Sequence, residues 1–252
     1  MSNLEELILK ITNKNRMKFV DGTEINNGIL VHLSRLNKFT FHIETNIRRE
    51  YIMNNLSTND ILETFTKIGY QEVGCIVNYL PKSGLCQIFS LPFVDNYLHF
   101  VGIEFPFIIF HHVTNLSLFE LTVPFEHDFF LRIARCFPSV KKLDVFNRMP
   151  QLHSSNDSNS NGNQSYPVVE YPHLISLELQ YCHIDYLELF LNNTKIHLPR
   201  LTELNVNYYQ LTIVTEDFTR DATRINCAQV KQLNIDDSEK LPTNFYTYFP
   251  LL

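Results

Sequence analysis

The sequence predicts an α/β fold in which short units of one strand and one helix stack side by side as a solenoid. Three observations support this prediction: an apolar pattern recurs at regular intervals, a proline motif precedes several of its copies, and helix-forming stretches lie between them. One strand and one helix cannot cover their own apolar face, so such units are stable only when neighbours stack.

The clearest copy of the pattern is LISLELQYCHI (174–184), whose apolar positions are Leu174, Leu177, Leu179, Cys182 and Ile184. These residues fit L-x-x-L-x-L-x-x-N/C-x-L, the pattern of a leucine-rich repeat of about 20–29 residues. Related stretches begin at residues 4, 36, 86, 113, 140, 174, 201 and 230, and the one at 86 is the weakest.

The last five intervals between these starts are 27, 27, 34, 27 and 29 residues, and the longest contains the polar insert 153–165. The insert is rich in Ser and Asn and is predicted to be a disordered loop. The sequence therefore predicts a single leucine-rich-repeat domain over 1–252, with irregular repeats over 1–85 and regular repeats over 86–252. Its parallel strands are expected to line a concave face, with the helices outside.

An aromatic residue or Leu followed by Pro precedes three copies, at Phe137-Pro138, Tyr171-Pro172 and Leu198-Pro199. Proline there ends the preceding helix and begins an extended segment.

Four helices are expected between the strands. PFEHDFFLRIARCF (124–137) has acidic residues early and arginines late, which suits the helix dipole. DYLELFLNN (185–193) begins with Asp185, three residues before Glu188, an arrangement that predicts a helix cap. TNDILETFTKI (58–68) and EVGCIVNYL (72–80) are predicted to be helical as well.

Composition excludes several classes of function. The formal net charge of the 252 residues is -6 and no Lys/Arg-rich run occurs, so neither nucleic acid nor an anionic membrane is an expected partner. The N-terminus lacks the features of a secretory signal, and no apolar run is long enough to span a bilayer. The five cysteines are odd in number and widely spaced, which predicts reduced thiols and a cytoplasmic or nuclear location.

Catalytic motifs are absent from the sequence, which has no G-x-S-x-G, Walker loop, G-x-G-x-x-G or H-E-x-x-H. His111-His112 and Glu126-His127-Asp128 are runs of adjacent residues, which do not converge on one metal ion. Cys182 occupies an apolar position of the repeat, where a thiol is inert. We therefore expect no catalytic site, no metal and no cofactor, and hence a protein that is not an enzyme.

Residues between the buried leucines should point to the concave face, because side chains alternate along a strand. This places on that face Asn115, Ser117, Phe119, Lys142, Asp144, Phe146, Ser176, Glu178, Gln180, Glu203, Asn205, Asn207, Gln232, Asn234 and Asp236. Tyr181, Tyr208 and Tyr209 follow two of the strands, and tyrosine is a frequent interface anchor. The predicted partner-binding residues are Phe119, Asp144, Phe146, Glu178, Gln180, Tyr181, Glu203, Asn205, Asn207, Tyr208, Asn234 and Asp236.

The repeats resemble the substrate-binding part of the F-box/leucine-rich-repeat family. The resemblance is carried by LEELIL (4–9), LNKFTF (36–41), HLISLELQYCHI (173–184) and RLTELNV (200–206), and it covers most of the chain. In that family an N-terminal F-box docks the adaptor of a cullin–RING ubiquitin ligase and the repeats capture the substrate. The chain departs from the family in that no F-box precedes the first repeat.

The resemblance implies a non-enzymatic protein-binding scaffold that acts as the substrate-recognition part of an F-box-type ubiquitin-ligase adaptor. The alternative is a complete adaptor that recruits the cullin–RING ligase through a degenerate F-box at 56–80. LSTNDILETF (56–65) is similar to the core of an F-box, although it lacks the proline and lies between repeats.

Overall fold

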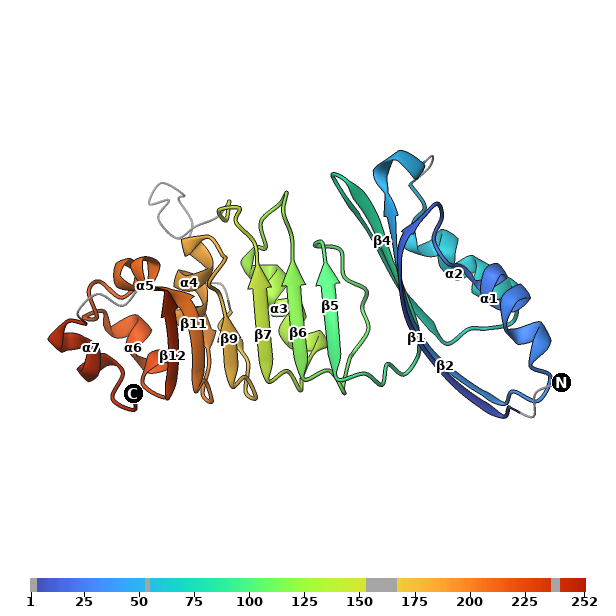
Figure 1. Cartoon of the computed structure of the whole chain (residues 1–252). Coiled ribbons are helices and arrows are strands. Elements are labelled where there is room, and N and C mark those ends of the chain that lie inside the picture. The colour runs from blue at the N-terminus through green and yellow to red at the C-terminus, as the bar shows by residue number, and fades with distance from the viewer. Residues whose placement is uncertain (1–3, 53–54, 153–166, 237–240) are drawn as a thin grey trace. The chain divides into compact units, whose positions relative to one another are not determined.

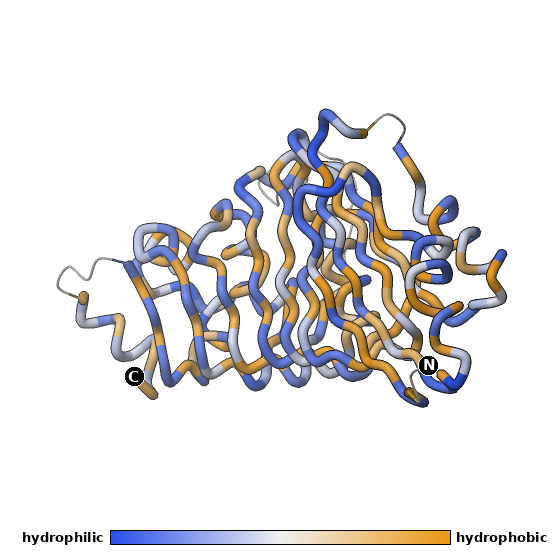
Figure 2. Tube along the Cα trace, turned by 45° about the vertical axis from the view of Figure 1, so that its right-hand side comes forward, coloured by the Kyte–Doolittle hydropathy of each residue, from blue (hydrophilic) through white to orange (hydrophobic). Residues whose placement is uncertain are grey.

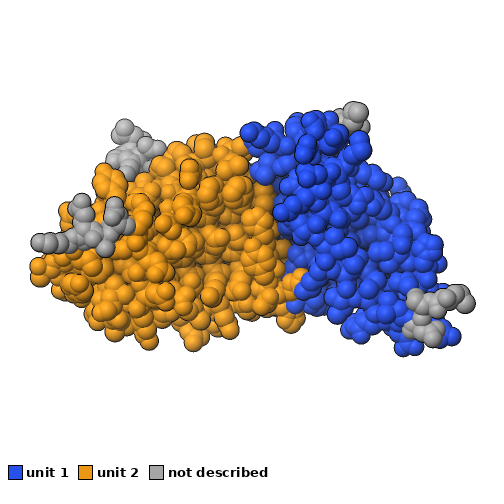
Figure 3. All heavy atoms as spheres, viewed as in Figure 1, with its two compact units in different colours: residues 1–94, 104–108 blue, residues 95–103, 109–252 orange. Residues whose placement is uncertain are grey.

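The computed structural model describes residues 4–52, 55–152, 167–236 and 241–252 (Figure 1). The chain divides into two compact units (Figure 3). Unit 1 consists of residues 1–94 and 104–108, and unit 2 of residues 95–103 and 109–252. Each unit has its own sheet. The sheet of unit 1 contains both parallel and antiparallel strand pairs, whereas the main sheet of unit 2 contains parallel pairs. The predicted disordered insert, 153–165, lies outside the described residues.

Unit 1 contains a four-stranded mixed sheet in the order β1-β2-β4-β3. Its strands are β1 (Glu6–Arg16), β2 (Lys38–Arg48), β3 (Val73–Leu80) and β4 (Ser83–Ser90). The pattern copies at 4 and 36 fall in β1 and β2, which pair in parallel, with Leu7 opposite Phe39. The copy at 86 falls in β4, which runs antiparallel to β2. That copy is therefore not part of a parallel array, contrary to the prediction.

Residues 72–80, expected to be helical, form strand β3 instead. The segment is joined to β4 by a tight hairpin and pairs with it along its whole length, from Val73 opposite Ser90 to Leu80 opposite Ser83. Val73 and Cys75 enter the core of unit 1 on one face of the sheet. The helix prediction was wrong because a short, almost continuous apolar run suits a buried strand as well as a helix, and sequence periodicity does not distinguish the two.

Two helices, α1 (Gly22–Gly28) and α2 (Thr58–Lys67), cover one face of this sheet (Figure 1). A capping box begins α2, in which the Ser57 hydroxyl accepts from the Asp60 N–H and the Asp60 carboxylate accepts from the Ser57 N–H. A Cβ on Gly22 would come within 2.7 Å of the Phe65 nitrogen, so glycine is required where the two helices approach. Two short 3-10 helices complete the unit, η1 (Leu30–His32) and η2 (Arg49–Tyr51).

Unit 2 contains a six-stranded sheet in which every neighbouring pair is parallel, in the order β12-β11-β9-β7-β6-β5. Its strands are β5 (Tyr97–Val101), β6 (Asn115–Phe119), β7 (Lys142–Phe146), β9 (Ser176–Glu178), β11 (Glu203–Asn207) and β12 (Gln232–Asp236). Within this sheet, each strand pairs with the strand of the sheet that precedes it in the sequence. The predicted mixed α/β class and parallel sheet are thus confirmed, whereas β5 was missed.

The remaining elements of unit 2 lie between these strands in the sequence, except α7, which follows β12. Two short strands, β8 (Val169–Glu170) and β10 (Ile196–His197), form a separate parallel pair. The helices are α3 (His127–Cys136), α4 (Ile184–Leu191), α5 (Tyr208–Val214), α6 (Asp221–Cys227) and α7 (Thr243–Tyr248). The helices expected at 124–137 and 185–193 are therefore present as α3 and α4.

The start of α4 differs from the expected cap. The N-cap is His183, whose Nδ1 accepts from the Asp185 N–H at 3.3 Å. Asp185 lies in the first turn and its carboxylate accepts from the Gln151 N–H at 2.9 Å. The N-cap must be the last residue with extended backbone, and His183 has that conformation, so Asp185 and Glu188 do not form a capping box.

Apolar side chains of neighbouring strands lie directly opposite one another on the buried face of the six-stranded sheet. Leu116, Leu143, Leu177 and Leu204 are consecutive register partners across β6, β7, β9 and β11, and none is more than 2% exposed. We call these four residues the leucine ladder. Hydrophobic and hydrophilic residues alternate along these strands (Figure 2), so the opposite face carries the polar side chains.

The segment before five of the six strands, namely β6, β7, β9, β11 and β12, has a recurring hydrogen-bonded turn. A buried residue accepts from the N–H three positions later, at 3.1–3.4 Å, in Phe110/Val113, Phe137/Val140, Tyr171/Leu174, Leu198/Leu201 and Cys227/Val230. At the start of the strand, a carbonyl accepts from two successive N–H groups of the neighbouring strand segment. The Lys141 carbonyl, for example, accepts from the N–H groups of Ile175 and Ser176. The motifs Phe137-Pro138, Tyr171-Pro172 and Leu198-Pro199 begin three of these five turns.

Truncating the leucine ladder should destabilise unit 2. We expect Leu177→Ala to lower the free energy of unfolding by about 2–5 kcal/mol, because the side chain is fully buried between Leu143 and Leu204. Urea titration followed by circular dichroism measures the loss. Leu152→Ala is the matched control, since Leu152 is 71% exposed and its truncation should change stability by less than about 0.5 kcal/mol. Equal effects of the two substitutions would contradict the ladder.

Candidate functional site

The face of the six-stranded sheet opposite the leucine ladder is the candidate site, and we call it the open face. Its side chains alternate with buried ones along each strand; in β6, for example, half-buried Asn115, Ser117 and Phe119 flank buried Leu116 and Leu118. The open face contains the strand residues of the predicted partner-binding set, namely Phe119, Asp144, Phe146, Glu178, Glu203, Asn205, Asn207, Asn234 and Asp236. The other three lie beyond the strand ends: Gln180 and Tyr181 are two and three residues after the end of β9, and Tyr208 is the first residue after β11.

The parallel register aligns one polar residue from each strand into a row across the open face. Ser117, Asp144, Glu178 and Asn205 are consecutive register partners. The Ser117 hydroxyl donates to the Asp144 carboxylate at 3.0 Å, and the Asn205 amide donates to Glu178. The Glu178 carboxylate also accepts from the Gln180 N–H at 3.2 Å. Two carboxylates therefore face each other with a neutral donor on either outer side.

Asp144 and Glu178, which we call the acid pair, form no ion pair with any residue that the structure describes. Burial raises the pKa of Glu178, and the charge of Asp144 raises it further, while hydrogen bonds from Gln180 and Asn205 act in the opposite direction. Like charges directly opposite each other on adjacent strands are unfavourable. The acid pair therefore concentrates negative charge that the described residues leave without a countercharge in contact.

An aromatic row lies beside the acid pair, toward the carboxyl ends of the strands. Phe119 and Phe146 are stacked, with ring centroids 4.9 Å apart, and Tyr181 lies 6.4 Å from Phe146. The guanidinium of Arg148 lies 5.5 Å from the centroid of the Phe146 ring, a cation–π arrangement. We call Phe119, Phe146 and Tyr181 the aromatic row.

The segments after the strands, which are loops and, after β11, the helix α5, expose large apolar side chains, which we call the apolar rim. Its members are Ile103, Leu121, Val123, Met149, Leu152, Tyr181, Tyr209 and Ile213. Buried polar residues hold two of these loops: Glu120 accepts from the N–H groups of Leu121 and Thr122, and Asn147 accepts from that of Met149. Of the apolar rim, the sequence analysis identified only Tyr181 and Tyr209. The other members could have been identified because each of them also follows the end of a strand.

Two predicted partner-binding residues have structural partners within the sheet. The Asn207 amide donates to the Asp236 carboxylate at 2.8 Å, and the other Asp236 oxygen accepts from the Tyr208 N–H at 3.0 Å. Asn207 also caps α5 by accepting from the Gln210 N–H. Asn207 and Asp236 thus connect β11 to β12 and position Tyr208 at the start of α5.

The sequence singled out Cys182 and two histidine-containing runs as groups that catalysis could use. The Cys182 thiol is buried and donates to the Val145 carbonyl at 2.8 Å, and burial raises its pKa to about 12. A thiol in this state is neither a nucleophile nor a metal ligand at neutral pH. His111 and His112 are exposed in a turn. Across the described ranges, no group of three or more His, Cys, Asp or Glu could hold a metal ion.

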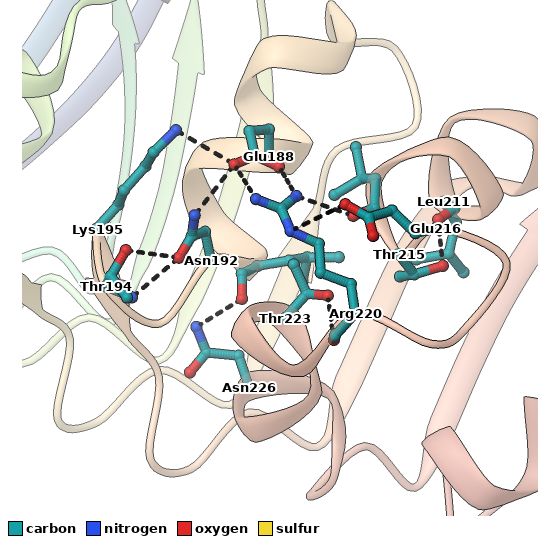
Figure 4. A network of polar contacts seen from close by, with 12 residues as sticks. Glu188, Asn192, Thr194, Lys195, Leu211, Thr215, Glu216, Arg220, Thr223 and Asn226 are labelled. Carbon is teal, nitrogen blue, oxygen red and sulfur yellow. Dashed lines mark hydrogen bonds and ion pairs between the residues drawn. The ribbon is translucent and has the colours of Figure 1, made fainter. Parts of the chain in front are cut away.

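The most connected polar cluster of unit 2 is centred on Glu188 of α4 (Figure 4). Arg220 donates to both of its carboxylate oxygens, Lys195 lies 3.3 Å away, and the Asn192 amide donates at 3.1 Å. Burial opposes ionisation of Glu188, but the hydrogen bonds from Arg220 and Asn192 and the nearby charges outweigh it and lower its pKa. Since its charges are already paired, this cluster is built to join α4 to residues 192–195 and 214–220.

Comparison with protein-family models, with curated proteins and with solved structures finds no match to the chain. No helix within the described ranges has both the length and the hydropathy needed to cross a bilayer. The arrangement of side chains on unit 2 is therefore the guide to function.

Removing one member of the acid pair should change the ionisation of the other. We expect Asp144→Asn to lower the pKa of Glu178. The pKa should not return fully to its ordinary value, because burial is the larger cause of the upward shift and remains in the variant. Carboxyl carbon NMR across a pH titration measures this. Glu203→Gln removes another negative charge of the same face and serves as the control, with a smaller expected effect. A Glu178 pKa that is unchanged by Asp144→Asn would contradict the coupling.

Neutralising Glu188 should destabilise the protein at neutral pH. A lowered carboxyl pKa contributes stability above the ordinary value of 4.5, and this contribution is lost as the pH falls through the pKa of the folded state. We expect Glu188→Gln to lower the free energy of unfolding at pH 7 by about 1–3 kcal/mol and to flatten its decrease below pH 4.5. Urea titrations at several pH values test both effects.

The control for Glu188→Gln is Asp221→Asn. Asp221 forms an ion pair with Arg224 at 3.5 Å, but its side chain is 92% exposed, so solvent screens the pair. A loss of stability as large as that of Glu188→Gln would show that burial of the Glu188 cluster is not the cause of its effect.

Proposed function

We propose that the chain is a non-enzymatic protein-binding scaffold whose open face and apolar rim receive a protein partner. The observation that carries the proposal is the apolar rim, which exposes large side chains at successive strand ends of one parallel sheet. Scattered exposed apolar residues need no explanation, but a run of them beside an aromatic row is typical of an interaction surface. Tyr181 belongs to both the rim and the aromatic row.

The proposal includes a leucine-rich-repeat solenoid over β5–β12. Support comes from the strand order, in which every strand of the six-stranded sheet lies beside its predecessor, and from the recurring turn before five of the six strands. Repeats that contact only their neighbours form an extended face of adjacent strands, and this geometry suits protein binding. The insert 153–165 interrupts the period between β7 and β9 without changing their pairing.

The more specific proposal is that this scaffold is the substrate-recognition part of an F-box-type ubiquitin-ligase adaptor. It rests on the resemblance carried by LEELIL, LNKFTF, HLISLELQYCHI and RLTELNV, and the open face would then be the surface that reads the substrate. The alternative, recruitment through a degenerate F-box at 56–80, has less support. Ile61 and Phe65 of α2 are buried in the core of unit 1, and 73–80 forms β3, so the apolar side chains of this segment are already used within the fold.

The test compares exposed tyrosines on and away from the proposed surface. Tyr181 and Tyr209 of the apolar rim are 55% and 72% exposed, and Tyr246 of α7 is 58% exposed. We expect the double substitution Tyr181→Ala/Tyr209→Ala to reduce recovery of a specific partner by about tenfold or more, since interface tyrosines often contribute more than about 1 kcal/mol each. Affinity purification from the source cells, followed by quantitative mass spectrometry, measures recovery.

Tyr246→Ala is the matched control and should leave recovery unchanged. All three side chains are exposed, so the variants should retain the fold, which circular dichroism verifies. A partner recovered equally well by the double variant, or the absence of any partner that distinguishes wild type from it, would contradict the proposed surface.

A further inference from the structure

We propose that the partner presents an arginine side chain, which binds between the carboxylates of Asp144 and Glu178 and stacks against the aromatic row. This inference rests on the proposed function and specifies the chemistry of the partner at that surface. It commits to a protein segment containing arginine as the occupant of the open face. Charge complementarity, the neighbouring rings and the spacing between them support it.

The first step is the unbalanced charge of the acid pair. The two carboxylates are register partners on adjacent strands, and the Ser117 hydroxyl and the Asn205 amide orient them from the outer sides without neutralising them. No Lys, Arg or His in the described ranges forms an ion pair with either carboxylate. A cation bound between them would remove the repulsion across β7 and β9, so a positively charged group gains more here than at an isolated carboxylate.

The second step is the wider charge of the open face. Its other charged side chains are the carboxylates of Glu203 and Asp236, the ammonium group of Lys142 and the guanidinium of Arg148 over the Phe146 ring. The acid pair and these groups together give four negative charges and two positive charges. This balance disfavours phosphate groups and acidic peptides and favours a basic segment.

The third step is the position of the aromatic row. Phe146 and Phe119 follow Asp144 and Ser117 by two residues on the same strands and the same face, which corresponds to about 7 Å along a strand. An extended arginine side chain spans that distance, with its guanidinium at the carboxylates and its methylene groups along the rings. The guanidinium of Arg148 already lies 5.5 Å from the centroid of the Phe146 ring, so an incoming arginine shares the aromatic row with this residue of the chain itself.

Arginine fits better than the other cations. Its planar guanidinium donates hydrogen bonds along several edges, so it bonds two carboxylates at once, while its methylene groups pack along the aromatic rings. The ammonium group of lysine is a point charge and does neither as well. A divalent metal ion requires more oxygen ligands than the acid pair supplies, and no group of three or more metal-binding side chains occurs within the described ranges.

The experiment uses the full chain, immobilised, and two peptide libraries. Both libraries have nine residues with random flanks; one has a fixed central arginine and the other a fixed central citrulline, the uncharged analogue of the same shape. We expect wild type to retain the arginine library about tenfold more than the citrulline library, the size of one charge-assisted hydrogen-bonded contact. A library with a central lysine should fall between the two.

The variant Asp144→Asn/Glu178→Gln should reduce the ratio of arginine to citrulline retention to near one. Glu203→Gln is the matched control, with a carboxylate on the same face outside the acid pair, and should keep most of the ratio. Both variants are checked by circular dichroism, and Asp144→Asn alone gives a second measurement because its side chain is exposed. A ratio that is the same in wild type and in the double variant, including one in which neither library is retained, overturns the inference.

The outcomes separate this inference from the proposed function. If peptides are retained equally with arginine or citrulline, and retention is lost in Tyr181→Ala/Tyr209→Ala, the surface binds protein segments but not through arginine. If calcium chloride at millimolar concentration displaces the arginine library and isothermal titration shows that wild type binds calcium directly, the acid pair is a cation site and the inference fails. If the arginine preference depends on the acid pair, the inference stands.

Discussion

Burial of the leucine ladder is the interaction on which unit 2 depends. Leu116, Leu143, Leu177 and Leu204 lie opposite one another across four parallel strands and are almost completely excluded from solvent. Each strand is short, and the one at the centre, β9, has three residues, so the backbone hydrogen bonds of a single strand are too few to stabilise it alone. Contact with the leucines of both neighbours makes the strands stable together.

Side chains in the loops strengthen the same stacking. The Asn147 amide donates to the Val123 carbonyl, the Cys182 thiol to the Val145 carbonyl, and the Gln210 amide to the Cys182 carbonyl. Each bond joins a loop to the preceding strand–helix unit and satisfies a backbone group that would otherwise be buried without a partner. A small donor after the strand, Asn in one unit and Cys in the next, thus serves the geometry of the loop. The exposed apolar rim is held in place by these bonds.

The open face is a consequence of the ladder. Once the leucines of adjacent strands are opposite one another, the residues between them must also be opposite one another, because side chains alternate along a strand. Ser117, Asp144, Glu178 and Asn205 form a row for this reason and not because they attract one another. The repulsion within the acid pair is tolerated because the leucines on the other side of the sheet hold the register. A surface that keeps an unfavourable pair of charges in this way is prepared to bind an oppositely charged group.

The apolar period and the turn motif were sufficient to determine five of the six parallel strands of unit 2, the positions of α3 and α4, and the face on which Asp144, Glu178 and Asn205 lie. These features depend on contacts between residues one repeat apart, so the pattern of one repeat predicts its relation to the next. The pairing of β4 with β2 and β3, the strand at 73–80, and the division into two units were decided by tertiary structure. A short apolar run satisfies either a helix or a buried strand, and only the sheet available to pair with it selects between them. Tertiary structure also decided the acid pair and the apolar rim, because the exposure of a side chain and the charge around it depend on which neighbours the fold brings into contact.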